Sequence, residues 1–405
     1  MRGPLAAIFL TVFLDLIGFG IVMPFLSLQA RDVFGVSEGV ATLLMASYSL
    51  AQFLFVPVWG RLSDRIGRRP VIVVSVFFTA VTMTLLGLAL GYADHVIWLF
   101  LARIFGGIAT ANIGTASAYI ADVTSKEDRV KGMGLIGMAF GLGFIIGPGL
   151  GGLLTEFQVN GREGPMACFA AGALSIINLL WVLKGLPESL SPEVRAQKAK
   201  RSLSPMNLSM VKNVLGHPFL SKAVLTNFLV ILAFSGLEVT YAFYAKDQFS
   251  LTASEVGWLF VFMGFVGAGI QGGFMRRAGS KYQDSHLILS GVLMQGLAFL
   301  MIVAASKMGL WLLLVGSAAL AIGNGLSQPS LSGFVSRRSS DAEQGSVLST
   351  HQSFSSLARV FGPALGGVVY HAMGPEAPFI LGSLINGIGV ILVMKLLASP
   401  MPSKA

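Results

Sequence analysis

The stretch from Leu5 to Leu28 reads LAAIFLTVFLDLIGFGIVMPFLSL, and as a helix it is long enough to cross the roughly 30 Å hydrocarbon core of a membrane. Asp15 lies near its centre. A carboxylate at that depth is costly unless it pairs, takes up a proton or faces water, so an acid inside a span predicts a functional site. The alternative is a structural hydrogen bond or an internal salt bridge to a neighbouring helix. The stretch therefore predicts a membrane protein with a polar pathway inside it, and proton carriage is one use of such a pathway.

The composition of the whole chain agrees with a membrane protein. Of its 405 residues, 54% are hydrophobic and 12% are charged, and the mean hydropathy is +0.76. Soluble domains carry about 25% charged residues, so a soluble globule is excluded. The only cysteine, Cys168, rules out an intrachain disulfide and a multi-cysteine metal site, and the five histidines show no metal-ligand spacing. The first apolar run is too long, and interrupted by Asp15, for a cleaved signal peptide.

Further apolar runs of membrane-spanning length follow the first one. They predict twelve helices in two sets of six, separated by a linker from Pro187 to Pro218 that holds four prolines and a basic run. The predicted domains are 1–186, the linker 187–218, and 219–405. The predicted helices cover 5–28, 39–60, 70–90, 96–120, 131–155, 166–186, 219–245, 253–275, 285–305, 309–333, 344–371 and 378–398.

The distribution of lysine and arginine predicts the orientation. With both termini in the cytoplasm, 22 of the 28 Lys and Arg residues fall on the cytoplasmic side and four on the outside. The other two, Arg103 and Arg359, fall inside spans. We therefore expect both termini in the cytoplasm, with the basic inner loops and linker close to anionic phospholipid.

The two sets of helices are related in sequence. Gly147-Pro148-Gly149-Leu150-Gly151-Gly152 and Gly362-Pro363-Ala364-Leu365-Gly366-Gly367 both fit G-P-x-L-G-G, 215 residues apart (362 minus 147). Two related halves with a site between them at the bilayer midplane predict an alternating-access carrier.

A basic, glycine-punctuated loop joins the second and third predicted helices, and it reads GRLSDRIGRRP from Gly60 to Pro70. Asp64 can cap a helix N-terminus, and the arginines can reach acids or lipid phosphates. Ordinary positive charge on the cytoplasmic side is the alternative, but one acid among four arginines at these glycine spacings favours a specific structure.

This loop resembles the helix 2–3 signature of the major facilitator superfamily, G-x-L-[SA]-D-[RK]-x-G-[RK]-[RK]. GLGFIIGPGLGG, from 141 to 152, is similar to the antiporter motif of its proton-coupled drug antiporters. Asp15, Gly18 and Pro24 resemble their first-helix pattern, and Arg103 with Gly107 resembles R-x-x-x-G in their fourth helix. The resemblance covers the chain, is nearest to the tetracycline/proton antiporter branch, and implies an all-α fold of twelve helices in two pseudo-symmetric bundles that usually works as a monomer.

The resemblance also implies roles for matching residues. Arg103 would take part in proton coupling, although snorkelling to the outer interface is an alternative. An inner lock would involve Asp122 as partner of the loop. The lock residues are Gly60, Asp64, Arg65, Gly67, Arg68, Arg69 and Asp122, and the residues that would shape the interface between halves and limit leak are Gly143, Gly147, Pro148, Gly151 and Gly152.

The chain departs from the tetracycline branch in two places. The predicted helices 70–90 and 285–305 lack the membrane acids that this branch carries. The second copy of the loop signature is reduced to Gly273-Phe274-Met275-Arg276-Arg277, without an acid, so we expect an asymmetric lock.

Two further charged residues lie inside predicted spans. Glu238 suits proton coupling or a cationic substrate, or else it structures the outer vestibule. Arg359 lies too deep to snorkel easily, so it needs Asp15 or Glu238 as a partner, or it binds an anionic substrate group. Most other polar residues in spans predict contacts between helices, but some predict a substrate cavity. The cavity candidates are Gln52, Asn112, Asn227, Phe234, Glu238, Tyr241 and Gln328.

No feature supports an enzyme. The candidate nucleophiles have no partnered histidine at a suggestive spacing, and no phosphate loop for ATP is present. The sequence thus predicts a proton-driven exporter of small lipophilic or amphipathic compounds, without a cofactor or nucleic acid partner, in a bacterial inner membrane. The alternatives are a narrower carrier of a sugar, metabolite or lysolipid by symport, uniport or flipping, and a non-transporting sensor or receptor.

Overall fold

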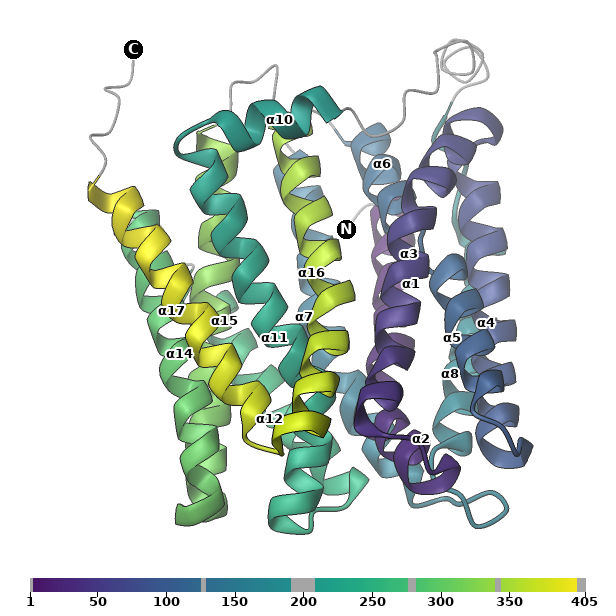
Figure 1. The fold of residues 1–405 in the computed structure, drawn as a ribbon. Coiled ribbons are helices and arrows are strands. Elements are labelled where there is room, and N and C mark those ends of the chain that lie inside the picture. The colour runs from purple at the N-terminus through teal and green to yellow at the C-terminus, as the bar shows by residue number, and fades with distance from the viewer. Residues whose placement is uncertain (1–2, 125–128, 191–207, 276–281, 339–343, 399–405) are drawn as a thin grey trace. The chain divides into compact units, whose positions relative to one another are not determined.

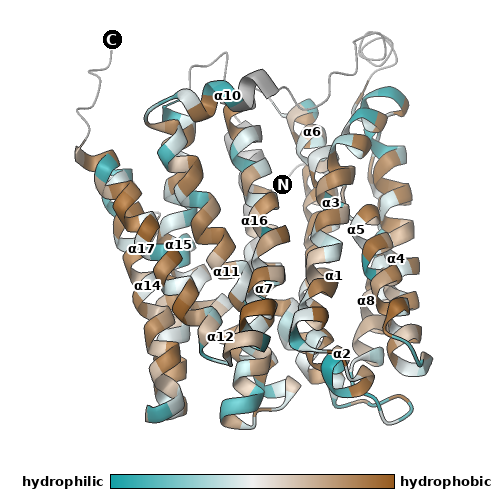
Figure 2. Ribbon diagram, in the orientation of Figure 1, coloured by the Kyte–Doolittle hydropathy of each residue, from teal (hydrophilic) through white to brown (hydrophobic). Residues whose placement is uncertain are grey.

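The computed structural model describes residues 3–124, 129–190, 208–275, 282–338 and 344–398 (Figure 1). Within these ranges almost all of the chain is helical. Ten helices are long and apolar enough to cross a membrane, where three helices that contain a short interruption are counted once each. A shorter apolar stretch, Gly141–Thr155, adds to them. Hydrophobic residues fill the middle of the helices and hydrophilic residues gather near their ends (Figure 2). The predicted all-α membrane fold is confirmed.

The first set of helices corresponds to the first six predicted spans. Two of these spans are each made of two helices, α1 with α2 and α5 with α6. The bounds are α1 Gly3–Ile21, α2 Leu26–Phe34, α3 Glu38–Ile66, α4 Arg68–Tyr92, α5 Ile97–Ala109, α6 Ile113–Val123, α7 Arg129–Thr155 and α8 Pro165–Gly185.

The second set corresponds to the last six predicted spans and is preceded by a short helix, α10. One span continues from α12 into a π-helical turn, η1. The bounds are α10 Leu208–Gly216, α11 Leu220–Phe249, α12 Ala253–Gly269, η1 Ile270–Phe274, α14 Asp284–Met308, α15 Leu310–Arg337, α16 Gln344–Met373 and α17 Ala377–Ala398.

The backbone contacts divide the chain into two compact units. The first unit comprises residues 1–205 and 251–261, and the second comprises 206–250 and 262–405. The start of α12 thus packs with the first unit, whereas the predicted domain boundaries put it with the second set of helices. Each unit has its own apolar core, which includes Ile8, Val76 and Tyr119 in the first and Val224, Val292 and Val347 in the second.

Two of the predicted spans are interrupted, whereas the sequence predicts each of them as one continuous helix. The first helix ends at Ile21, and a turn that contains Pro24 leads into α2. Proline has no N–H for the helical ladder and disfavours helix in the residue before it. The fourth predicted span is interrupted at Thr110–Asn112, where Ala111 N bonds to Ile108 O in a tighter turn. We call Thr110–Asn112 the helix break.

Glycines bring α1 and α7 into close contact in the first unit. A Cβ atom on Gly147 would lie 2.8 Å from Gly20 Cα, one on Gly143 would lie 2.7 Å from Leu16 Cβ, and one on Gly151 would collide with Ile21 O. These three glycines are four residues apart and so form one stripe along α7. Small residues of this kind let two helices approach closely in a membrane.

The second unit repeats this contact between α11 and α16. A Cβ atom on Gly362 would lie 2.6 Å from Leu232 O, and one on Gly366 would lie 3.0 Å from Gly236 O. Gly362 and Gly366 each follow their counterparts in α7 by 215 residues (362 minus 147, 366 minus 151). The repeated G-P-x-L-G-G sequence therefore specifies the same helix crossing twice.

Candidate functional site

Asp15 is half-buried on α1 and is held by two amide side chains. The Nδ2 atom of Asn112, at the helix break, donates to Asp15 Oδ2 over 3.0 Å, and the Nδ2 atom of Asn178, on α8, donates to Asp15 Oδ1 over 3.4 Å. Asn112 and Asn178 are both buried. Among the described residues, two neutral donors and no cation contact the carboxylate, which leaves the acid able to exist with or without its proton.

Aromatic rings lie close to this acid. Phe19 follows Asp15 by four residues and so lies on the same face of α1. Its ring centroid is 5.4 Å from that of Tyr48 on α3 and 6.0 Å from that of Phe144 on α7. Phe19 and Phe144 are only half-buried. An acid beside partly accessible aromatic rings can bind an apolar compound that carries a polar or cationic group.

Side chains from neighbouring helices donate hydrogen bonds to the backbone carbonyl groups at the helix break. Trp59 Nε1 donates to Ile108 O over 2.6 Å, Ser75 Oγ to Ala109 O over 2.6 Å, and Gln52 Nε2 to Thr110 O over 3.2 Å. Three successive carbonyl groups are thereby bonded outside the helical ladder, as buried backbone groups require. Gln52, a predicted cavity residue, therefore has a structural role at the break.

Arg103 is buried on α5, with 1% of its surface exposed, and does not snorkel. Its guanidinium carbon lies 3.9 Å from the centroid of the Tyr48 ring, and its Nη2 atom lies 3.5 Å from Met45 Sδ. Its Nε atom has no hydrogen-bond partner in the described part of the chain. Tyr48 in turn bonds to Thr110 Oγ1 over 2.5 Å, so Arg103 is connected through Tyr48 to the helix break.

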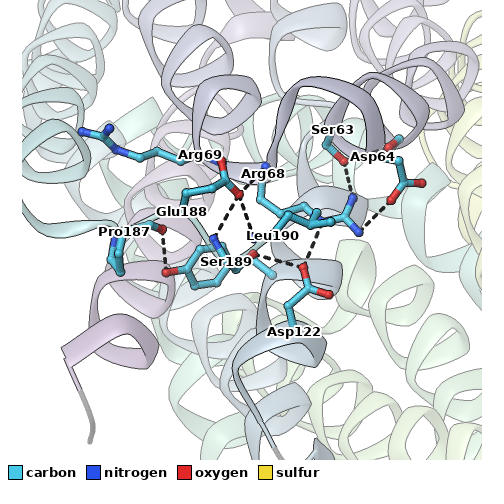
Figure 3. A network of polar contacts seen from close by, with 11 residues as sticks. Ser63, Asp64, Arg68, Arg69, Asp122, Pro187, Glu188, Ser189 and Leu190 are labelled. Atoms are coloured by element: carbon cyan, nitrogen blue, oxygen red, sulfur yellow. Dashed lines mark hydrogen bonds and ion pairs between the residues drawn. The ribbon is translucent and has the colours of Figure 1, made fainter. Parts of the chain in front are cut away.

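The predicted lock residues Asp64, Arg68 and Asp122 meet at one end of the first unit (Figure 3). Arg68 Nη2 lies 2.8 Å from Asp64 Oδ1, and Arg68 Nε lies 3.1 Å from Asp122 Oδ2. Its Nη1 atom donates to Ser63 Oγ over 2.6 Å. The Arg68 side chain is 4% exposed, against 41% for Asp64 and 22% for Asp122. A buried planar guanidinium with two acids at its edge is a stable charged pair network.

Glu188 completes this network, although its position in the sequence indicates only a residue of the predicted linker. Its Oε1 atom accepts from Arg68 N over 2.9 Å and its Oε2 atom from Arg69 N over 3.2 Å (Figure 3). It therefore caps the N-terminus of α4. Asp64 pairs with the Arg68 side chain, and the capping role suggested for Asp64 stays a prediction. We call Ser63, Asp64, Arg68, Asp122, Glu188 and Ser189 the arginine lock.

The other predicted lock residues have different positions. Gly67 ends α3 and precedes α4 with a φ of 109°, a conformation that favours glycine. Gly60 lies within α3, where a Cβ atom would meet nothing within 4 Å. Arg65 is exposed, and Arg69 Nη2 donates to Leu183 O over 2.7 Å. In the second copy of the loop signature, which lacks the acid, Arg276 and Arg277 lie outside the described residues. The basic run of the predicted linker also lies outside them.

In the antiporter motif, Gly143, Gly147 and Gly151 pack on α1, and Pro148 approaches Gly20, where a Cβ would lie 3.0 Å from Pro148 Cδ. Gly152 faces another helix, because its Cβ would lie 3.0 Å from Gly257 Cα, which belongs to the same compact unit. Most of the motif therefore forms a contact within the first set of helices.

The remaining candidates lie in the second unit. Glu238 on α11 is half-buried, and the charge of Arg359 on α16 acts on it attractively. Asn227 is buried and donates to Ser355 Oγ over 2.7 Å, while Tyr241 is buried and bonds to Ser317 Oγ over 2.6 Å. These two contacts hold helices together, which argues against a cavity position. Phe234 and Gln328 are half-buried.

Comparisons with known proteins agree with this architecture. The model of the Major Facilitator Superfamily matches residues 8–283 and 223–405. Multidrug resistance protein 2 of Bacillus subtilis is 27% identical over 95% of this chain and 93% of its own length. The class C tetracycline resistance protein of Escherichia coli is 31% identical over 89% of this chain and 88% of its own. The crystal structure of the human organic anion transporter MFSD10 (TETRAN) matches with a TM-score of 0.72 and 26% identity, over 97% and 99% of the two chains.

Long apolar helices in two sets that share the same glycine-based crossing, with charged side chains between helices in the described part of the chain, are typical of a multi-pass membrane transporter. The chain belongs to the Major Facilitator Superfamily. It is a transporter and not an enzyme, as the sequence predicted. The likeness to multidrug and tetracycline resistance proteins agrees with the drug antiporter branch of the family.

Proposed function

We propose that this transporter exports small lipophilic or amphipathic compounds, drugs among them, in exchange for protons that move inward. One observation carries the proposal. Asp15 lies in the interior of the first unit, held by the amides of Asn112 and Asn178, with the rings of Phe19 and Phe144 close by. A carboxylate that contacts only neutral groups changes the charge of the site when it takes up a proton.

The exchange follows from competition at this site. A proton from outside neutralises Asp15, which removes an intramembrane charge and allows the change to the inward-facing state. A compound from the cytoplasm then binds beside the aromatic rings and displaces the proton. Glu238 with Arg359 is a second candidate for the coupling step, and Arg103 takes part through Tyr48, which lies in the field of both Arg103 and Asp15. The arginine lock stabilises the outward-open state and must break before the carrier opens inward.

The cellular setting is part of the same proposal. We place the protein in a bacterial inner membrane as a monomer, with both termini in the cytoplasm because most of the basic residues lie in the loops on that side. The arginine lock then lies on the cytoplasmic side, and the exposed Arg65 next to it and the other basic residues of the inner loops would meet anionic phospholipid. The proton gradient is the energy source, and no cofactor is needed.

Proton release from vesicles tests the proposal. The protein is reconstituted into proteoliposomes that hold a pH-sensitive dye, and lipophilic cations and tetracyclines are added in turn. Wild type is compared with Asp15→Asn and with Asp94→Asn, a control in which the changed acid is exposed between helices. We expect at least one compound to release protons in wild type and in the control but not in Asp15→Asn. Transport of labelled compound without any proton movement in wild type would contradict the proposal.

A narrower carrier of organic anions is the second candidate, and Arg103 favours it. This buried guanidinium has no carboxylate within salt-bridge distance among the described residues, so an anionic group of a substrate could pair with it. MFSD10 (TETRAN), the human protein of similar structure, is an organic anion transporter. Uptake of labelled organic anions by the same vesicles, lost in Arg103→Gln and retained in Asp15→Asn, would favour this candidate.

A further inference from the structure

Asp15 and the arginine lock are joined by two arms, each of which spans ten residue positions. Asn112 lies at the start of α6, and Asp122 follows it by ten residues (122 minus 112). Asn178 lies on α8, and Glu188 follows it by ten residues (188 minus 178). The amide at one end of each arm donates to Asp15, and the acid at the other end binds Arg68. A helix rises 1.5 Å per residue, so the α6 arm reaches about 15 Å, whereas the α8 arm is helical only as far as Gly185 and its last three residues lie beyond the helix.

The two arms are also tied to each other beside the lock. The hydroxyl of Tyr119, on α6, donates to Pro187 O over 3.0 Å. The hydroxyl of Ser189 donates to Asp122 Oδ2 over 3.0 Å. Tyr119 is fully buried. A movement of either arm at the Asp15 end must therefore change the contacts of Arg68 at the other end.

The arms differ in their freedom to move. The α8 arm belongs to a continuous helix from Pro165 to Gly185. The α6 arm begins at the helix break, where side chains of α3 and α4 bind the last carbonyls of α5. Upstream of the break, α5 is fixed against α3, because a Cβ atom on Gly107 would collide with Tyr48 O. The helix break therefore gives the α6 arm a discontinuity in its backbone hydrogen bonds that α8 lacks between Pro165 and Gly185, and we take this break as the point about which α6 would move.

We propose that Asn112 is a positioning residue that transmits the state of Asp15 through α6 to Asp122 and so to the arginine lock. This inference rests on the proposed function, in which Asp15 gains and loses a proton. When Asp15 is charged, its hydrogen bond from Asn112 is charge-assisted and about twice as strong as a neutral one. Neutral Asp15 holds Asn112 less tightly, α6 shifts, and Asp122 loosens its hold on Arg68.

Few other titratable groups act on this contact. Tyr48 on α3 lies in the field of both Asp15 and Arg103, and Cys168 on α8 lies near Arg103. The described part of α7 from Leu135 to Thr155 has no titratable side chain. A change in the charge of Asp15 is therefore the change that acts on the α6 arm, through the hydrogen bond from Asn112.

Accessibility of a cysteine in the lock measures this transmission. Ser63 is buried, and its hydroxyl accepts from Arg68, so Ser63→Cys places a small reporter inside the arginine lock. The native Cys168 is fully buried and gives a low background. The full-length reporter protein is treated with a maleimide in detergent, with and without Asp15→Asn, which mimics the neutral acid. We expect Asp15→Asn to speed the reaction about fivefold or more, as the weaker bond to Asn112 requires.

Variants at Asn112 decide whether α6 carries the effect. In an Asn112→Ser background, the residue remains a good helix cap but is too short to keep its bond to Asp15. We expect the effect of Asp15→Asn on the labelling rate to fall below about twofold there. In the matched Asn178→Ala background, which alters the continuous arm, the fivefold effect should remain. Thermal unfolding of each variant verifies that it is folded, and Asn112→Ala replaces Asn112→Ser if the latter is not.

Three results would overturn the inference: no effect of Asp15→Asn on the reporter, an equal effect with and without the Asn112 change, or loss of the effect only in Asn178→Ala. Failure of the proposed function gives a different result, because Asp15→Asn would then leave proton release from vesicles intact. If Asp15→Asn abolishes proton release but leaves the labelling rate unchanged, the transmission through α6 is rejected and the proposed function is not.

Discussion

Gly147 of α7 lies against Gly20 of α1 so closely that a Cβ atom at position 147 would be 2.8 Å from Gly20 Cα and 2.8 Å from Ile17 O. Backbone therefore meets backbone at this crossing, and no side chain can move aside to make room. The same stripe of α7 holds the part of α1 that follows Asp15. The position of the acid thus depends on glycines in another helix.

The first prediction concerns this stripe. Gly147→Ala should destabilise the protein by about 2–4 kcal/mol, because overpacking against a fixed backbone shifts both helices. Gly141→Ala, in the same helix, should be neutral or slightly stabilising, since a Cβ there meets nothing within 4 Å and alanine favours helix. Thermal unfolding in detergent compares the two variants. Equal melting temperatures would contradict the role of the stripe.

The second prediction concerns the turn between α3 and α4. Gly67 has a φ of 109°, so Gly67→Ala should cost about 1–3 kcal/mol of backbone strain and loosen the arginine lock next to it. Gly60→Ala provides the control from the same loop signature, because Gly60 is within α3 and has open space around it. The melting temperature should fall only in Gly67→Ala. A similar fall in both variants would show that the effect does not come from φ.

The third prediction concerns Glu188. Glu188→Gln removes the negative charge at the start of α4 and replaces one acceptor oxygen with a donor, so the bonds from Arg68 N and Arg69 N cannot both survive. Because the side chain is half-buried and partly screened, we expect a loss of about 1–2 kcal/mol in stability. The control is Asp94→Asn, which changes an exposed acid. An unaltered melting temperature in Glu188→Gln would mean that water replaces the cap without loss.

The fourth prediction concerns the helix break. Trp59→Phe removes the shorter hydrogen bond to Ile108 O and leaves that carbonyl with the longer bond from Ala111 N, which should cost about 0.5–1.5 kcal/mol. Trp98→Phe makes the same chemical change at a side chain that is 55% exposed and should be close to neutral. Unfolding followed by circular dichroism distinguishes the two variants. A neutral Trp59→Phe would indicate that the break finds another donor.

Much of the fold could be predicted from the sequence, because length and hydropathy define spans directly. The twelve apolar runs correspond to helices, and the repeated G-P-x-L-G-G corresponds to a repeated crossing. The breaks in the first and fourth spans were missed. Pro24 was a visible signal for the first, but the fourth has no proline, and only the small residues around Thr110 mark it.

The candidate site was less predictable than the fold. Asp15, Asp64, Arg68 and Asp122 stand out because charge is rare in or next to apolar runs. Phe19, Phe144, Asn178 and Glu188 do not stand out, because phenylalanine and asparagine are common in membrane helices and Glu188 resembles a linker residue. Their importance comes from contacts between residues up to 163 positions apart, and no local pattern reports such contacts.

The break between α5 and α6 also has an electrostatic consequence. It places the beginning of a helix inside a membrane-spanning segment, with Asn112 as its N-cap and without a side-chain cap of its own. The first turn of a helix presents N–H groups that the helix does not use, and its dipole gives that end about half a positive charge. Asp15 is bonded to this N-cap. The fold thus adds positive potential from peptide groups to the hydrogen bonds that two amide side chains donate to this carboxylate, and unlike a lysine or arginine the peptide groups cannot swing away or lose a proton.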